Sequence, residues 1–274
     1  MPTLSLLSTV RFPALLHLAG AVALLAAMLL PAPARAIASS TGLVDSRQVV
    51  LVTSDGWDSN QATLRRFERA GDTQAWQEVG AAFAVSLGRN GSAWGTGLHA
   101  PADQAAGPVK REGDGRSPAG IFGIGQAFGY AADAGPLRLR YEQMDATDYC
   151  IDVPASPLYN RIVDSRDVGA AAVEGSTEPM RLDLHKDRDP RYRLGLVIEH
   201  NTRAEPDQGS CIFAHLWRTP GEPTAGCTAM ADADMEALLA WLDPAAQPRF
   251  VLLPVAEYGR LAAPWQLPLV EASR

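Results

Sequence analysis

The chain has 274 residues, of which 24 are Lys or Arg and 31 are Asp or Glu, so its formal net charge at pH 7 is −7. This length suffices for one sizeable hydrophobic core and exceeds that of small disulfide-stapled proteins. An acidic chain without a basic run argues against nucleic acid as the main partner. Glycine and proline contribute 24 and 20 residues, a turn-rich composition that stays below the level typical of disorder.

The first segment has the features of an export signal. Residues 13–30 form an apolar run of 18 residues after Arg11, and no acidic residue occurs before Asp45. Ala34-Arg35-Ala36 has the small-x-small form of a signal-peptidase site, so residues 1–36 are expected to be removed as a signal peptide. A retained membrane anchor is the alternative, although such a run is at the short limit for crossing a bilayer. We expect a periplasmic or secreted protein with no stable membrane anchor after cleavage.

After a short linker at residues 37–47, the sequence predicts one β-rich domain over residues 48–274. Runs rich in β-branched and aromatic residues predict strands at 48–54, 62–69, 75–79, 84–87, 149–153, 193–200, 210–217 and 249–254. Runs 62–69 and 75–79 flank a turn and predict a hairpin. Three glycines at positions 120, 123 and 125 suggest a glycine-rich loop. No Lys-Ser/Thr follows them, as it would in a phosphate-binding loop, so they are interpreted as turns around a strand. Many short strands with few helices favour an α+β fold over alternating βαβ units.

The clearest helix is predicted over residues 232–243. Apolar side chains recur at helical spacing on one face of it: Met235, Leu238, Leu239 and Leu242. Asp232 is expected to cap its first turn and Pro244 to end it.

A cysteine and a histidine lie close to this helix in the sequence. Cys227 stands in PTAGCTAM (223–230), and a thiol near a helix N-terminus is expected to be stabilised as the thiolate. Gly226 allows a tight turn in which backbone amides converge on an oxyanion. His215 ends a predicted strand twelve residues earlier and can act as a general base. Spacing alone is equally compatible with a buried structural cysteine and a core histidine.

The order of these residues resembles the L,D-transpeptidase family. Segments 210–217 (SCIFAHLW) and 224–230 (TAGCTAM) are similar to its catalytic signature, a histidine on a strand, a loop, then Ser/Thr-x-Gly-Cys and a helix. Segment 110–122 (KREGDGRSPAGIF) is similar to its T/S-P-x-G-x-F element, and segments 152–160 and 198–201 resemble one secreted bacterial branch. The resemblance covers residues 80–254 and implies a β-sandwich with a helix after the catalytic cysteine.

The resemblance implies acyl transfer on peptidoglycan stem peptides without a cofactor. Cys227 would attack a tetrapeptide stem, expel the terminal D-alanine and pass the resulting thioester to an amine of another stem. His215 would move the protons, amides at Gly226 and Cys227 would hold the oxyanion, and Thr224 matches the family's Ser/Thr position and would support the turn. With water as the acceptor the same site would be an L,D-carboxypeptidase or amidase. A catalytically inactive wall-binding domain is a third interpretation.

One position departs from the family pattern. Most members have an arginine two residues after the cysteine, and this chain has Ala229 there. Arg218 or Arg116 is the candidate to supply the missing contact with the substrate. His200 and Trp217 are further candidates for substrate binding, with a hydrogen-bonded structural histidine and a core tryptophan as the alternatives.

A zinc site is the competing interpretation of the cysteines and histidines. Cys211, His215 and Cys227, with His200, offer the spacing C-x3-H-x11-C. This is not the paired C-x2-C pattern of structural sites, and no HExxH is present. We therefore expect no metal.

The two remaining cysteines are expected to form a disulfide. Thiols outside the cytoplasm tend to oxidise, and pairing Cys150 with Cys211 would leave Cys227 free. This bond would close a loop of about 60 residues and anchor the strand that carries His215. Two buried thiols that never meet are the alternative, and the Cα atoms must lie within about 7 Å for a bond to form.

Overall fold

The structure is a computed structural model that describes residues 42–71 and 73–270. The predicted signal peptide and residues 37–41 of the predicted linker lie outside the described residues. Residues 42–47 do not behave as a linker, because Leu43 is buried and its carbonyl accepts a hydrogen bond from Arg69 Nη2 at 2.6 Å. The described fold therefore begins before residue 48.

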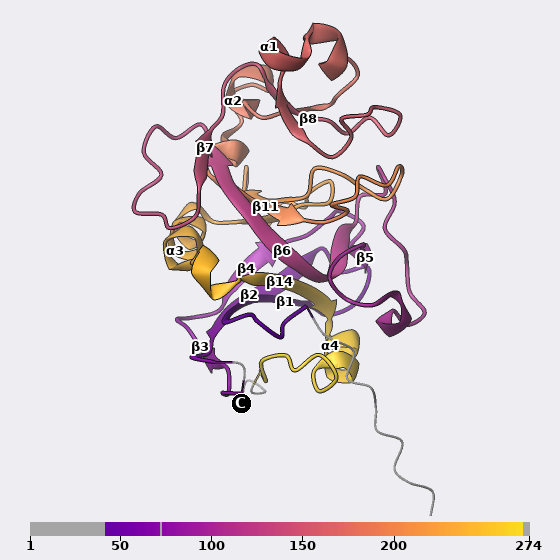
Figure 1. The fold of residues 1–274 in the computed structure, drawn as a ribbon, viewed down its shortest axis with the longest axis vertical. Coiled ribbons are helices and arrows are strands. Elements are labelled where there is room, and N and C mark those ends of the chain that lie inside the picture. The colour runs from indigo at the N-terminus through magenta and orange to yellow at the C-terminus, as the bar shows by residue number, and fades with distance from the viewer. Residues whose placement is uncertain (1–41, 72, 271–274) are drawn as a thin grey trace, which may run out of the picture. The chain divides into compact units, whose positions relative to one another are not determined.

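Eight strands close into a barrel (Figure 1). Strand β1 (Gln48–Ser54) pairs in parallel with β14 (Arg249–Pro254) and antiparallel with β2 (Gln61–Glu68). The order β1-β14-β6-β11-β12-β13-β4-β2 therefore returns to β1. The other barrel strands are β4 (Phe83–Ser86), β6 (Ser117–Gly129), β11 (Gly195–Glu199), β12 (Phe213–Leu216) and β13 (Thr228–Met230). The predicted β-rich α+β class is confirmed, whereas a closed barrel does not confirm a two-sheet sandwich.

Shorter strands extend the barrel and form a second sheet. Strand β3 (Gln77–Glu78) pairs with β2, which confirms the predicted hairpin. Strands β5 (Ser92–Trp94) and β7 (Tyr141–Gln143) pair with β6. The second sheet has the order β10 (Glu178–Pro179), β8 (Asp148–Cys150) and β9 (Ile162–Asp164).

Strand β6 is the longest strand described, and the sequence did not predict it. Its glycines were interpreted as turns around a strand, yet they lie inside the strand. Gly120 has φ +137°, and a Cβ at this position would lie 2.1 Å from His99 Cε1. Only glycine combines this backbone conformation with such a close approach. The adjacent Ile121 N–H donates to His99 Nδ1 at 3.1 Å, so the strand packs directly on that ring.

Helix α3 (Asp232–Trp241) follows the barrel strand β13. Its predicted apolar stripe is buried, which confirms the helix. The predicted cap is wrong: Ala231 is the N-cap, and Asp232 pairs instead with Arg193. The other helices are α1 (Ser165–Val168), α2 (Leu182–His185), α4 (Val255–Leu261) and the 3-10 turns η1 (Pro101–Asp103), η2 (Ala170–Val173), η3 (Pro190–Tyr192) and η4 (Pro244–Ala246). Within residues 42–71 and 73–270, no helix is both long and apolar enough to cross a bilayer.

Residues 145–192 form a cap on the barrel. The cap contains the second sheet, α1, α2 and η3, and lies above β11 in Figure 1. One apolar cluster joins cap and barrel through Cys150, Met180, Leu182 and Tyr192 on one side and Phe128, Cys211 and Phe213 on the other. Cys150 and Cys211 form a disulfide with Cα atoms 5.9 Å apart, which confirms the predicted pairing. The cap is thereby bonded to the segment that leads into β12.

Candidate functional site

Cys227 and His215 project from the same face of two neighbouring parallel strands. Strands β12 and β13 pair with His215 opposite Ala229. Cys227 lies one step before β13, where its Sγ accepts a hydrogen bond from the N–H of Phe213 at 3.4 Å. Because side chains alternate along a strand, Phe213 and His215 share a face, as do Cys227 and Ala229. This face meets the cap, since Tyr192 packs edge-on against the His215 ring at 5.4 Å.

The Cys227 thiol is neutral at ordinary pH. It is partly buried and donates to the carbonyl of Cys211 at 3.5 Å. Burial raises the pKa of Cys227 to about 12, and the negative charge of Glu178 acts in the same direction. Burial therefore opposes the thiolate that the nearby helix was expected to stabilise. Strand β13 separates Cys227 from α3, which begins only at Asp232.

His215 is held as a neutral base. Its Nδ1 lies 2.8 Å from the carbonyl of Leu216. A ring nitrogen facing a carbonyl carries the proton, so the lone pair of the neutral ring is on Nε2. The pKa of His215 is lowered to about 4, chiefly by burial and also by the positive charge of Arg191, while the Leu216 hydrogen bond and the charge of Asp189 oppose this shift. Imidazole and thiol are both neutral at rest.

Two hydroxyls hold the carbonyl of Cys227. Thr224 Oγ1 donates to it at 2.6 Å and Ser117 Oγ at 3.0 Å. Ser117 in turn accepts from the N–H of Gly88 at 2.9 Å. Thr224 was expected from the sequence to support the turn before Cys227, and its hydroxyl contacts both Gly226 and Cys227 of that turn. Ser117 was not among the predicted site residues. The signal for it in the sequence is its position as the first residue of the S-P-x-G-x-F segment.

The amide of Gly226 is already occupied. Its N–H donates to Thr224 Oγ1 at 3.1 Å, which closes the turn before the cysteine. No described residue accepts a hydrogen bond from the N–H of Cys227. The amide that remains for an oxyanion is therefore that of Cys227, and the expected role of Gly226 as an oxyanion donor does not fit this geometry.

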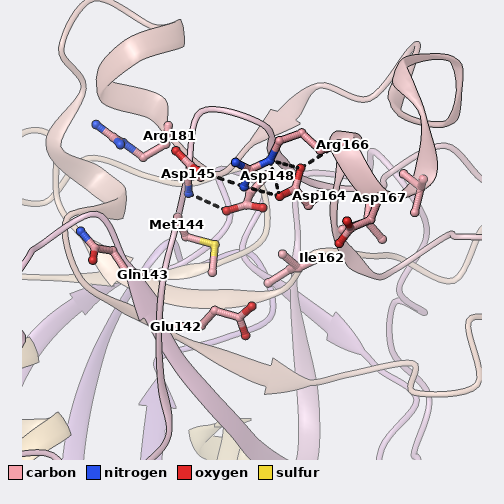
Figure 2. Close-up of a pocket in the computed structure, with 12 residues that line it drawn as sticks. Glu142, Gln143, Met144, Asp145, Asp148, Ile162, Asp164, Arg166, Asp167 and Arg181 are labelled. Carbon is pink, nitrogen blue, oxygen red and sulfur yellow. Dashed lines mark hydrogen bonds and ion pairs between the residues drawn. The ribbon is translucent and has the colours of Figure 1, made fainter.

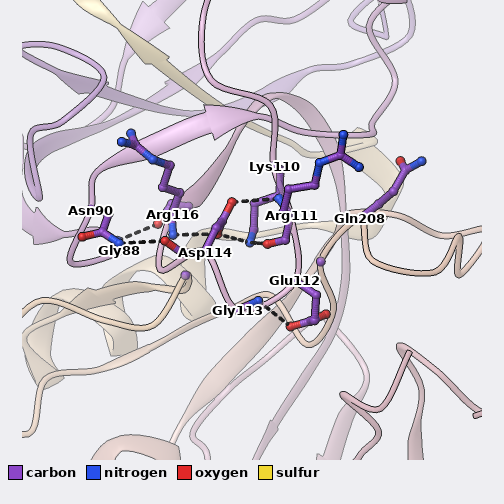
Figure 3. Close-up of polar contacts among 12 residues, drawn as sticks. Gly88, Asn90, Lys110, Arg111, Glu112, Gly113, Asp114, Arg116 and Gln208 are labelled. Carbon is purple, nitrogen blue, oxygen red and sulfur yellow. Dashed lines mark hydrogen bonds and ion pairs between the residues drawn. The ribbon is translucent and has the colours of Figure 1, made fainter. Parts of the chain in front are cut away.

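A buried ion pair shapes the loop that delivers Ser117 (Figure 3). Lys110 Nζ pairs with Asp114 Oδ1 at 2.6 Å, and the same oxygen accepts from the N–H of Arg116 at 2.9 Å. Asn90 Nδ2 donates to the Asp114 carbonyl at 2.8 Å. A buried lysine and carboxylate satisfied in this way fix the loop geometry, and removing either one would leave an uncompensated charge.

The guanidinium of Arg116 is used within the fold. It donates to the carbonyls of Trp57 at 3.1 Å and Ser92 at 3.0 Å and pairs with Asp58 at 2.7 Å. The structure gives it no contact with the thiol or the imidazole. Trp217 is similarly engaged, because its Nε1 donates to Ser86 Oγ at 2.8 Å.

Arg218 lies near the position of the missing family arginine. It lines a small hollow of about 10 Å³ together with Arg191, His215 and Ala229. This hollow has room for about one water molecule. Arg218 is exposed and pairs with Glu222, so a substrate anion would have to compete with that carboxylate.

His200 is a structural histidine in this fold. It is buried, its Nε2 lies 2.9 Å from the carbonyl of Gln208, and its ring packs edge-on against Phe122 at 5.7 Å. Burial lowers the pKa of His200 to about 4. His200 also lines a groove between residues 145–192 and the barrel.

The cap groove lies between the cap and the barrel and has a volume of about 450 Å³. It is lined by residues of both parts, among them Cys150 and Arg161 from the cap and Val197, Glu199, Cys211 and Phe213 from the barrel. Cys211 and Phe213 are also the two residues whose backbones contact the Cys227 sulfur. Cys227 does not itself line the groove, and these two residues separate the groove from its sulfur.

A larger hollow of about 670 Å³ lies on the cap and is rich in carboxylates (Figure 2). Arg166 pairs there with Asp145 at 3.0 Å and with Asp164 at 2.5 Å. None of the site residues predicted from the sequence lines it.

The zinc alternative is overturned by the disulfide. Cys211 is bonded to Cys150 and offers no thiolate to a metal. In the part of the chain that the structure describes, no group of three or more His, Cys, Asp or Glu side chains is arranged to hold a metal ion.

In comparisons with known proteins, no family model matches the chain, and neither a curated protein nor a solved structure gives a significant match. The resemblance noted in the sequence therefore rests on the motifs alone, and the arguments for function rest on the geometry of Cys227 and His215.

Proposed function

We propose that the protein is a cysteine acyltransferase of the L,D-transpeptidase type that acts on peptidoglycan stem peptides. The observation that carries this proposal is the placement of the Cys227 and His215 side chains on one face of β12 and β13, with the lone pair of His215 on Nε2. We assign the chain the L,D-transpeptidase-like fold. In this chain the strands expected to form a two-sheet sandwich close into a barrel.

In the first step, Cys227 attacks the carbonyl carbon of the stem peptide. Its proton passes to Nε2 of His215, and the N–H of Cys227 stabilises the oxyanion. Collapse of the tetrahedral intermediate breaks the peptide bond, and His215 returns the proton to the leaving amine. The products are a thioester on Cys227 and free D-alanine.

The neutral resting pair favours proton transfer during the attack over a preformed ion pair. Burial disfavours both the thiolate and the imidazolium, so neither forms before the substrate arrives. The hydroxyls of Thr224 and Ser117 fix the Cys227 carbonyl, which supports a single orientation of the nucleophile.

In the second step, an amine of another stem takes the acyl group from the thioester. Water in its place would make the protein an L,D-carboxypeptidase. No ATP, metal or other cofactor is required by either outcome.

The substrate lies outside the cytoplasm, which agrees with the export predicted from residues 1–36. The Cys150–Cys211 disulfide supports an oxidising compartment. We propose a periplasmic or secreted location. N-terminal sequencing of the exported protein should begin at Ile37, and a sequence beginning at Met1 would contradict cleavage.

The activity is tested with purified tetrapeptide muropeptides. The protein should release D-alanine and form either a cross-linked product or a tripeptide stem, both separable by chromatography. Cys227→Ala should abolish both products without unfolding the protein. Full release of D-alanine by Cys227→Ala would contradict the proposal, and a folded, inactive wild-type protein that still binds peptidoglycan would favour a wall-binding domain.

A further inference from the structure

The cap groove contains two opposite charges that make no hydrogen bond or ion pair with the described part of the chain. The structure gives neither the Arg161 guanidinium nor the Glu199 carboxylate a hydrogen bond or ion pair with any described residue, although both line the groove. Three other arginines of the cap are each paired with an aspartate: Arg166, Arg181 and Arg191. Arg161 and Glu199 are both exposed, so a charged ligand can reach them.

Arg161 and Glu199 lie on either side of Cys211, the residue whose carbonyl contacts the Cys227 thiol. Arg161 follows Asn160, whose Oδ1 accepts from the N–H of Cys211 at 2.8 Å. Glu199 ends β11, the strand paired with β12 just after Cys211. A ligand held between the two charges would thus lie against Cys211, the residue that accepts from the Cys227 thiol.

Two glycines of β6 keep the groove open. A Cβ at Gly123 would lie 1.9 Å from Glu199 Oε2, and a Cβ at Gly125 would lie 3.2 Å from Val197 Cβ. The side chain of Glu199 can therefore lie against the strand. Arg249 attracts Glu199 only through space, because its guanidinium donates to the carbonyls of Gly42 and Pro248.

On the basis of the acyl transfer proposed above, we propose that the cap groove is the subsite for the zwitterion of an α-amino acid. Arg161 binds its carboxylate, and Glu199 binds its ammonium group. D-alanine, the first product, carries both charges and leaves through this groove. The acceptor then enters by the same route, because its amine must approach the carbonyl from the side that the leaving amine vacated.

The transfer step forms one carbon–nitrogen bond and breaks one carbon–sulfur bond. The acceptor ammonium first loses one proton to solvent. The amine nitrogen then bonds to the thioester carbon while the carbon–sulfur bond breaks. A second proton passes from the nitrogen through His215 to the departing sulfur and restores the Cys227 thiol. Binding of the carboxylate by Arg161 orients the amine and takes no part in the proton transfers.

The first test measures binding without turnover. D-alanine is titrated into the exported Cys227→Ala protein and followed by NMR. It should bind, and adding either Arg161→Ala or Glu199→Gln should weaken binding by about tenfold or more, because each removes a charge-assisted contact. Arg161 is exposed, so its replacement should leave the fold intact, and Arg161→Lys should restore part of the affinity.

The matched controls are Arg203→Ala and Glu205→Gln. These two residues form an exposed pair with atoms 3.8 Å apart and do not line the groove. Each control should change binding by no more than about twofold. Failure of D-alanine to bind, or equal losses in the controls, would overturn the subsite.

The second test separates the subsite from the proposed activity. In the active protein, Arg161→Ala should raise the acceptor KM for isotope-labelled D-alanine by about tenfold or more and leave the KM for methylamine, which has no carboxylate, unchanged. An unchanged KM for D-alanine would overturn the subsite and leave the transferase standing. Binding that depends on Arg161 and Glu199, with no acyl-enzyme formed, would support the subsite and reject the transferase.

Discussion

The raised pKa of Cys227 predicts how slowly its thiol reacts with an alkylating reagent. Burial disfavours the charged thiolate, so the pKa rises to about 12 and less thiolate exists at any given pH. At pH 7 an exposed cysteine with a pKa of about 8.5 is roughly 3% thiolate, whereas Cys227 would be about 0.001% thiolate. Since the thiolate is the reactive form, the native protein should be alkylated roughly 10³-fold more slowly than the unfolded one.

The assay follows iodoacetamide labelling by mass spectrometry between pH 6 and pH 10. The signal belongs to Cys227, because the chain has three cysteines and the other two form a disulfide. The native rate should rise about tenfold per pH unit across this range without levelling off. The same protein in urea should level off above about pH 9.

A native rate that levels off below about pH 8 would refute this reasoning. It would mean that the thiolate is already stabilised at rest, as in an ion pair with protonated His215. His215→Ala separates the two cases. It should leave the alkylation rate nearly unchanged if the resting pair is neutral, and should slow alkylation if an ion pair is present.

The other predictions concern the base, the disulfide and the turn before the nucleophile. His215→Ala should slow D-alanine release by roughly 10²–10⁴-fold, whereas the exposed control His185→Ala should stay within about twofold of the wild type; equal effects would argue against a base. The unfolded, unreduced protein should titrate as one free thiol, and replacing both Cys150 and Cys211 by serine should lower the free energy of unfolding in urea by about 2–4 kcal/mol; three free thiols would contradict the bond. Thr224→Val should lower kcat about tenfold with little change in KM, because it frees the carbonyl that orients the nucleophile; a change in KM alone would point to substrate binding instead.

Several strands were predictable because they are short runs rich in β-branched and apolar residues. The predicted run 48–54 matches β1, and 249–254 matches β14. Strand β6 was missed because glycine is rare in strands. Its glycines serve close approaches from His99 and Glu199, which lie far away in the sequence. Barrel closure was equally hidden, since it depends on β1 pairing with both β2 and β14.

The motifs located the nucleophile and the base, but not the electrostatics around them. The expected thiolate relied on the helix that begins at Asp232, and the sequence TAM between Cys227 and that helix was not recognised as the strand β13. The burial that raises the pKa of Cys227 arises where the cap meets the barrel, at the cluster in which Tyr192 of the cap packs against Phe213 of the barrel. No local pattern reveals such packing.

Contacts between distant segments account for the remaining differences. Arg116 was a candidate for substrate binding because of its charge, yet it binds the backbone near Trp57. Conversely, Arg161 and Glu199 are ordinary surface residues in the sequence. Only the fold brings them to one groove, which Cys211 also lines.

The covalent intermediate is the central claim, and trapping it is the most direct test. The exported protein is mixed with a tetrapeptide stem, quenched in acid within seconds, and its intact mass and peptide map are measured. The account predicts a mass increase equal to the acyl tripeptide, located on the peptide that contains Cys227 and absent from Cys227→Ala. Release of D-alanine with no adduct at any time, or an adduct on another residue, would contradict it.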